Sequence, residues 1–216
     1  MKRNKNIASQ RQRIILKLLY IKISGIPVLF ISFLLAFLLS GSACKKQTIP
    51  KPHGYFRIDL PQKNYRLFDS ACHYTFEYPF YSKITADTDL NSEPCWINIS
   101  YPEYNANIHI SYKQVNGNLE EMIEDAHVLV YKHTIKADAI NEDFYQNEEN
   151  RVYGILYDIR GDAASSVQFW LTDSTYHYLR GALYFMTEPD EDSLAPVIAF
   201  IKEDIVHLIE TVNWKK

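Results

Sequence analysis

The sequence predicts an α+β fold in which an antiparallel sheet, built partly as a meander, has helices packed on it. Segments that alternate polar and apolar residues occupy 65–115, and three longer ones follow Arg151. An amphipathic helical stripe follows each of these two groups. The order strands, helix, meander, helix indicates α+β layering, because each apolar face must be covered by another element.

Three strands are predicted in the first group, over His73–Tyr78, Trp96–Tyr101 and Asn107–Tyr112. The last two alternate with period two and are separated only by residues 102–106, so we expect them to form a hairpin.

A helix is predicted next, with Asn118 as its N-cap and Glu121 completing a capping box. Its apolar stripe comprises Leu119, Met122, Ile123, Ala126 and Val130. The meander then runs through Val152–Ile159, Ser166–Leu171 and Tyr176–Met186, because Gly, Asp, Ser or Pro residues suited to turns follow each strand.

The final helix is predicted to start at Ser193 as N-cap, with Pro196 in its first turn. A continuous apolar stripe follows: Leu194, Val197, Ile198, Ile201, Ile205, Leu208, Ile209 and Val212. The predicted order of elements is similar to that of small α/β/α sandwiches of the PsbP/Mog1 type, a fold-level analogy that implies no activity.

The first 43 residues predict a lipoprotein signal peptide. Seven basic residues and no acidic one precede Cys44, and the apolar run IPVLFISFLLAFLL covers Ile26–Leu39. Small residues lead into Cys44, which resembles the lipid-modified cysteine of a bacterial lipobox, although Gly41 stands where Leu is usual. The alternative is a retained transmembrane anchor, since about 20 residues could nearly span a bilayer. Either arrangement places the domain outside the inner membrane.

Residues 44–54 predict a tether, because they are polar and contain Pro50 and Pro52, which favour extended geometry. Residues 55–216 predict a single globular domain. Of the 23 basic and 26 acidic residues, 16 basic and all 26 acidic ones follow residue 43, so the mature part carries a charge of −10. This excess of acid argues against nucleic acid as a partner, because phosphate binding needs clustered Lys and Arg.

Cys72 and Cys95 remain in the mature part. In an oxidising compartment they predict one disulfide, worth about 3 kcal/mol for a loop of this size, and two buried thiols are the alternative. The bond requires either parallel pairing of the strands that follow the two cysteines or an approach through the preceding loops. No nucleophile elbow, phosphate-binding loop, dinucleotide fingerprint or histidine pair at metal-binding spacing occurs, so the sequence predicts a non-enzyme without metal or cofactor.

Long runs of residues resemble the family of gliding motility-associated lipoproteins GldD of Bacteroidetes, over nearly the whole mature chain. The runs are PKPHGYFRIDLP (Pro50–Pro61), YTFEYPFYSKI (Tyr74–Ile84), IHISYK (Ile108–Lys113), YKHTIKADAI (Tyr131–Ile140), VYGILYDIRGDAASSVQFWLTDS (Val152–Ser174), LRGALYF (Leu179–Phe185) and PDEDSLAPVIAFIKEDIVHLIETVNW (Pro189–Trp214). The resemblance implies a cell-envelope lipoprotein needed for gliding and for the linked type IX secretion machinery, with other envelope proteins of that system as partners. It implies no catalytic residue.

The expected anchor is a lipid, including palmitate, on Cys44, and the expected location is the outer membrane with the domain facing the periplasm. Lys45-Lys46-Gln47 lacks the acidic residues that tend to follow the cysteine of surface-exported Bacteroidetes lipoproteins. The alternative function is a periplasmic carrier or chaperone for a small apolar ligand, with Tyr176, Tyr178, Tyr184 and Phe185 lining its pocket.

Three serines stand in Asp-Ser contexts that resemble a Bacteroidetes O-glycosylation signal: Ser70, Ser174 and Ser193. Ordinary turns and a helix cap explain the same residues, so both interpretations stay open.

Overall fold

The structure of the chain, a computed structural model, describes residues 33, 58–188 and 190–215. Apart from Phe33, the predicted signal peptide, Cys44 and the tether 44–54 lie outside the described residues. Within the described part, no helix is long and apolar enough to cross a membrane.

Seven strands form the larger sheet in the order β3-β4-β5-β9-β8-β7-β6, and each neighbouring pair is antiparallel. The predicted hairpin is confirmed as β4–β5 and the predicted meander as β7–β8–β9. β5 pairs with β9, so strands far apart in the sequence join the two halves of the sheet. The strands are β3 (Lys83–Ala86), β4 (Ile97–Tyr101), β5 (Ala106–Gln114), β6 (Ala137–Asn147), β7 (Val152–Gly161), β8 (Ser165–Thr172) and β9 (His177–Phe185).

The edge strand β6 is absent from the sequence-based prediction. Its sequence, ADAINEDFYQN, contains Asp138, Glu142 and Asp143 and shows no clear apolar alternation. β6 pairs with β7 alone, so its outer edge is open. An edge strand needs less apolar surface than a central one, and charged side chains on it oppose pairing with other chains.

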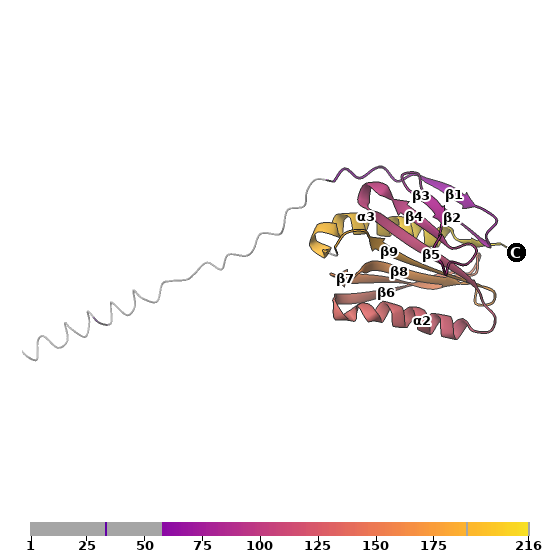
Figure 1. Ribbon diagram of the computed structural model, residues 1–216. Helices are drawn as coiled ribbons and strands as arrows, with labels where there is room; N and C mark the ends of the chain where they lie inside the picture. The colour runs from indigo at the N-terminus through magenta and orange to yellow at the C-terminus, as the bar shows by residue number, and fades with distance from the viewer. Residues whose placement is uncertain (1–32, 34–57, 189, 216) are drawn as a thin grey trace, which may run out of the picture. The chain divides into compact units, whose positions relative to one another are not determined.

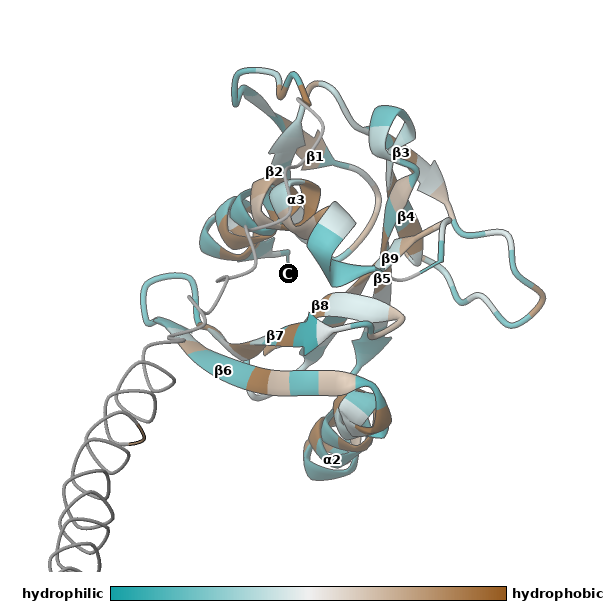
Figure 2. Cartoon of the chain, turned by 90° about the vertical axis from the view of Figure 1, so that its left-hand side faces the viewer, coloured by the Kyte–Doolittle hydropathy of each residue, from teal (hydrophilic) through white to brown (hydrophobic). Residues whose placement is uncertain are grey.

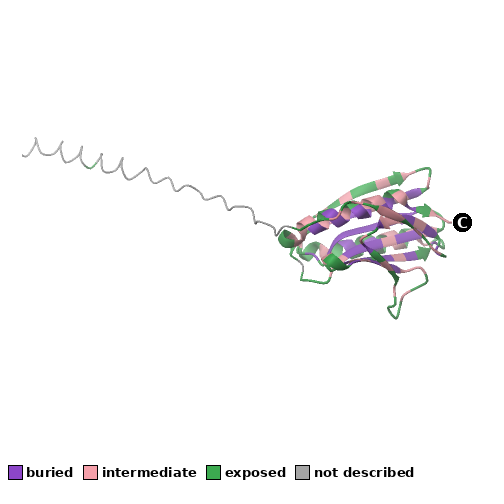
Figure 3. Ribbon diagram, turned by 90° about the horizontal axis from the view of Figure 1, so that it is seen from above, coloured by how far each residue is buried: buried purple, intermediate pink, exposed green. Residues whose placement is uncertain are grey.

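Helices cover both faces of the larger sheet, which confirms the predicted α/β/α sandwich (Figure 1). α3 (Glu191–Thr211) lies on one face and α2 (Leu119–Tyr131) on the other. Along β7, Leu156 belongs to the core under α3, whereas Tyr157 and Ile159 belong to the core under α2. All residues of β8 are buried, as expected for a strand covered on both faces. Figure 3 shows that the buried residues gather in the interior of the domain.

Both helices are confirmed, but their N-terminal caps differ from the prediction. Asn118 precedes α2 without a side-chain cap bond, because its Oδ1 accepts from the backbone N–H of Asn116 at 2.9 Å. The N-cap of α3 is Asp190, whose Oδ1 accepts from the N–H of Ser193 at 3.3 Å, so the prediction of Ser193 as N-cap is wrong. Since α3 starts earlier, Pro196 lies inside the helix and not in its first turn.

A smaller sheet lies beside α3 and joins the two ends of the described domain. Its order is β1-β2-β10, with β1 over Tyr65–Asp69, β2 over Tyr74–Pro79 and β10 over Asn213–Trp214. β2 pairs antiparallel with both neighbours. Residues from the start and the end of the domain therefore hold each other in place.

Asp204, on the buried side of α3, anchors the segment that leads into β1. Its side chain is only 1% exposed. Lys63 Nζ lies 2.7 Å from its Oδ1, the Tyr65 hydroxyl donates to the same oxygen at 2.9 Å, and the Tyr81 hydroxyl donates to Oδ2 at 2.8 Å. The Lys63 ammonium also lies 3.5 Å from the centre of the Phe200 ring. The buried carboxylate is thus satisfied by charge and by hydrogen bonds.

The electrostatics of this cluster keep both hydroxyls as donors. Burial, and then the hydrogen bond to Asp204, raise the pKa of Tyr65 and of Tyr81 above the ordinary value. The cluster joins three segments: the chain that leads into the first residue of β1, the turn after β2, and α3. An acidic residue inside an apolar helical stripe is the signal that would have revealed it.

Asp204→Asn should lower the free energy of unfolding by about 2–3 kcal/mol, because it removes the counter-charge of Lys63 and sets an amide N–H₂ against hydroxyl donors. Urea denaturation measures the change. Glu203→Gln is the control, since Glu203 lies 3.6 Å from Lys63 but is 71% exposed, and its effect should stay within about 0.5 kcal/mol. Equal effects of the two substitutions would contradict the role of Asp204.

Candidate functional site

A groove opens at the end of the domain where the C-terminus lies (Figure 1). Its volume is about 700 Å³. We call it the end groove and define it by two sets of residues. Five ring-bearing side chains line it: His73, Tyr112, Tyr176, His177 and Trp214. Seven polar or charged residues complete it: Gln114, Glu149, Asn150, Arg151, Asp173, Asn213 and Lys215.

The strand order brings these residues together. The end of β5, the turns β6–β7 and β8–β9, the residue before β2 and the strand β10 all meet at this end of the domain. β10 and Lys215 close one side, because the Lys215 N–H donates to the His73 carbonyl at 2.8 Å and the Trp214 indole N–H to the Arg151 carbonyl at 3.1 Å. The groove is therefore a product of the tertiary fold and has no contiguous motif.

Asp173 shapes the β8–β9 turn that forms one wall. Its Oδ1 accepts from the backbone N–H groups of Thr175, Tyr176 and His177 at 2.9, 2.7 and 2.8 Å. Burial alone would raise the pKa of Asp173, but these bonds to the carboxylate outweigh it and lower the pKa below its ordinary value. The carboxylate is thus committed to holding the turn.

The rings form a connected cluster on the groove. The Tyr112 hydroxyl and His177 Nδ1 are 2.9 Å apart, and the His177 ring stacks on Trp214 with centroids 5.1 Å apart and 6° between planes. His73 stacks on Tyr112 at 5.4 Å. The Tyr176 side chain is 59% exposed at the rim. Stacked rings of this kind make a rigid wall.

The charges of the groove lining sum to zero, and most of these charged side chains form hydrogen bonds or ion pairs with other protein atoms. Glu149 and Asp173 balance Arg151 and Lys215. The Arg151 guanidinium donates to the Asp173 carbonyl at 3.2 Å and to the Thr175 hydroxyl at 2.9 Å, and the Lys215 ammonium pairs with the Asp69 carboxylate. Among the described residues, no three His, Cys, Asp or Glu side chains are grouped to hold a metal ion.

The residues proposed as sites from the sequence are distributed over both ends of the domain. Ser70 and Ser174 lie in turns at the end where the groove opens, and Ser193 lies at the other end, at the start of α3. Ser174 and Ser193 are exposed, whereas Ser70 is half-buried and its Oγ accepts from the Cys72 N–H. Cys44 lies outside the described residues.

Cys72 and Cys95 are joined in the structure, with their Cα atoms 5.5 Å apart. The strands that follow them, β2 and β4, belong to different sheets, so the cysteines approach through the loops before the strands. The Tyr74 hydroxyl donates to the Cys95 carbonyl at 2.7 Å beside this link. The bond connects the smaller sheet to the larger one, next to the end groove.

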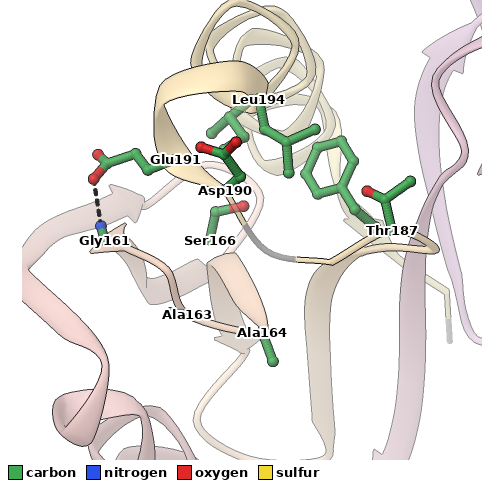
Figure 4. Close-up of a pocket in the computed structure, with 10 residues that line it drawn as sticks. Gly161, Ala163, Ala164, Ser166, Thr187, Asp190, Glu191 and Leu194 are labelled. Atoms are coloured by element: carbon green, nitrogen blue, oxygen red, sulfur yellow. Dashed lines mark hydrogen bonds between the residues drawn. The ribbon is translucent and has the colours of Figure 1, made fainter.

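A second cavity lies between the β7–β8 turn and the start of α3 (Figure 4). The Gly161 N–H donates to Glu191 Oε2 at 2.6 Å across its edge. Its volume is about 10 Å³, about the space that one water needs. Phe185 lines this small cavity, Tyr176 lines the end groove, and Tyr178 is buried under α2, so the four rings proposed for an apolar carrier pocket do not share one cavity.

The family model described as gliding motility lipoprotein GldD matches residues 45–214. The chain belongs to this family. No curated protein matches the chain significantly in sequence. The solution structure of cyanobacterial PsbP (CyanoP) from Synechocystis sp. PCC 6803 is similar over 76% of this chain and 99% of that chain, at 9% identity and a TM-score of 0.46.

Membership of the GldD family makes the chain a gliding motility lipoprotein of the cell envelope, associated with a membrane through its lipid. The sequence did not predict the residues of the end groove as a site. Tyr176 alone was proposed to line a pocket, and that pocket was an apolar one. A signal for them was present in Thr172–His177, where an Asp followed by two hydroxyl residues and two rings is typical of a tightly bonded turn. Nothing in the sequence indicated that Trp214 would meet this turn.

The stability of this GldD-family domain should fall as the pH drops below 6.5, the ordinary pKa of histidine. Burial lowers the pKa of His177, Asp173 partly opposes this, and His73 adds to it. Between the folded and unfolded pKa values the unfolded chain binds a proton that the folded chain does not, so the free energy of unfolding decreases with falling pH. Asp173 contributes to stability through its lowered pKa, and this contribution is lost only in a separate pH range, below its ordinary pKa of 3.8.

His177→Gln should flatten the slope of unfolding free energy against pH in the window just below 6.5, as measured by urea denaturation at a series of pH values. His109→Gln is the control, because the exposed His109 lies on β5 away from the groove lining. An unchanged slope in His177→Gln would contradict the assignment.

Proposed function

We propose that the chain is a non-catalytic lipoprotein that supports gliding motility and the linked type IX secretion machinery through protein–protein contacts. The observation that carries the proposal is the family match over residues 45–214, nearly the whole part that follows Cys44. The geometry agrees with a non-catalytic role, because the charged groups of the end groove that form ion pairs or hydrogen bonds hold turns and strands together.

The proposed anchor is a lipid on Cys44, and the proposed location is the outer membrane with the domain facing the periplasm. The family match begins one residue after Cys44, at the position where a mature lipoprotein chain would continue. The absence of acidic residues from Lys45-Lys46-Gln47 supports the periplasmic face. The tether 44–54 would then let the domain reach partners away from the bilayer.

The proposed partner-binding surface lies on α2, on the 3-10 helix η2 (Lys132–Ile135) that follows it, and on β6, and we call it the α2–β6 surface. It comprises Val128, Tyr131, Ile135 and Phe144, whose exposed fractions are 43%, 38%, 92% and 77%. The Tyr131 hydroxyl donates to Glu142 at 2.9 Å, which joins the helix to the face of β6 that carries Phe144. Figure 2 shows hydrophobic segments on both elements. Apolar side chains exposed together mark interaction surfaces more than isolated ones do.

Ile135→Asp and Phe144→Asp should abolish gliding and reduce export of type IX cargo, without lowering the amount of the lipoprotein in the envelope. The measurements are cell movement on a surface, cargo in the medium and envelope proteins recovered with the tagged, lipidated chain. Recovery of the partner should fall by roughly tenfold or more, as for loss of a central apolar contact.

Leu90→Asp is the matched control, because Leu90 is fully exposed in the β3–β4 loop, outside this surface. Cells that carry this variant should glide and secrete type IX cargo as cells with the unaltered chain do. Normal gliding and secretion by both surface variants would overturn the proposed surface. Normal gliding and secretion by a strain lacking the protein would overturn the proposed function itself.

The covalent state of the mature protein gives a further prediction. We propose lipid on Cys44, a Cys72–Cys95 disulfide and O-glycan on at least one of Ser70, Ser174 and Ser193. The intact mass should equal the polypeptide from Cys44 plus acyl groups and glycan, less the two thiol hydrogens lost in the bond. Cys44→Ser should retain the disulfide and lose the lipid. Ready alkylation of Cys72 and Cys95 without reductant would contradict the disulfide, and a mass equal to lipidated polypeptide alone would contradict the glycan.

A further inference from the structure

The end groove is separate from the α2–β6 surface and has no part in the proposed protein contacts. We propose that the end groove binds a short segment of an uncharged oligosaccharide. Its volume of about 700 Å³ falls within the range of roughly 300–1,000 Å³ that small-molecule sites occupy.

The rings provide the apolar component of such a site. A pyranose presents C–H groups on its faces, and an aromatic ring with exposed surface can pack against them. Tyr176 is 59% exposed at the rim and makes no side-chain hydrogen bond with the described residues, so its ring is available. Trp214 and His177 are held in place by stacking and by the indole bond to Arg151, which makes the wall rigid before a ligand arrives.

The amides provide the polar component. The Gln114 and Asn150 side chains line the groove and form no hydrogen bond within the part of the chain that the structure describes. Each amide carries both donors and an acceptor, which is the combination that a hydroxyl or acetamido group can satisfy. An apolar ligand would leave these groups unpaired, at a cost in free energy.

The charge of the lining argues against ionic ligands. Its two carboxylates and two basic groups cancel, and Asp173, Arg151 and Lys215 already bind protein atoms. An anion or a cation would find no excess of opposite charge. A sugar without net charge requires none.

The backbone argues against an extended peptide. Peptides that add to a sheet need a free strand edge with unpaired N–H and C=O groups. The groove lies across strand ends and turns, and the edge strand that lines it, β10, spans only two residues. The N–H groups of Thr175, Tyr176 and His177 are taken by Asp173. The geometry of the groove therefore favours a glycan over an extended peptide as its ligand.

The test is titration of the lipidated mature chain in detergent with two glycans, followed by calorimetry. One arm uses peptide-free glycan strands from the cell wall whose lactyl carboxylates have been converted to amides, because removal of the peptides leaves these groups charged. The other arm uses the neutral outer polysaccharide cut from surface lipopolysaccharide. Saturable binding in either arm is expected, and the arm that binds identifies the source. Tyr176→Ala and Asn150→Ala should each weaken binding by roughly fivefold or more, as for loss of one aromatic or amide contact.

Phe144→Ala is the control, because Phe144 is exposed on the α2–β6 surface and should leave glycan binding unchanged. This control also separates the two proposals, since Phe144 variants affect the partner contacts and Tyr176→Ala does not. Absence of saturable binding in both arms would overturn the inference. So would glycan binding that neither groove variant weakens.

Discussion

The placement of the N-terminal part of the domain depends on one buried carboxylate. Asp204 lies in the apolar interface of α3, where an unpaired charge would be strongly unfavourable, and Lys63, Tyr65 and Tyr81 satisfy it. These partners lie before, at the start of and after the first two strands of the smaller sheet, so the carboxylate adds polar contacts to the packing of Phe76 that also holds the sheet on α3. Because β10 pairs with β2, the closing side of the end groove depends indirectly on the same carboxylate.

The two candidate surfaces arise from different physics. The α2–β6 surface consists of apolar residues that stay exposed to solvent after an amphipathic helix and an edge strand have each buried one face. The end groove is built from turns, and its rigidity comes from hydrogen bonds such as those to Asp173 and from the stack of His177 on Trp214.

Periodicity predicted the central strands and the helices because burial imposes it. β8 is buried throughout, and α3 buries Val197, Ile201 and Ile205 as its stripe indicated. Periodicity failed where burial does not determine the structure. β6 pairs with one neighbour alone, and the start of α3 is set by a hydrogen bond to the side chain of its N-cap, Asp190. The end groove escaped prediction because its rings come from segments separated by up to the length of the domain, and no local pattern encodes their meeting.

The hydrogen-bond geometry of β1 has a mechanical consequence for a protein tied to a membrane and used in motility. The described chain enters at one end of the domain, passes Lys63 and continues as β1 towards the end with the groove (Figure 1). A pull between an upstream anchor and a load at the groove would act along the axis of β1. Its bonds to β2 would then be sheared together and not opened one after another, which is the stiffer loading direction. The Asp204 cluster would bear the force first.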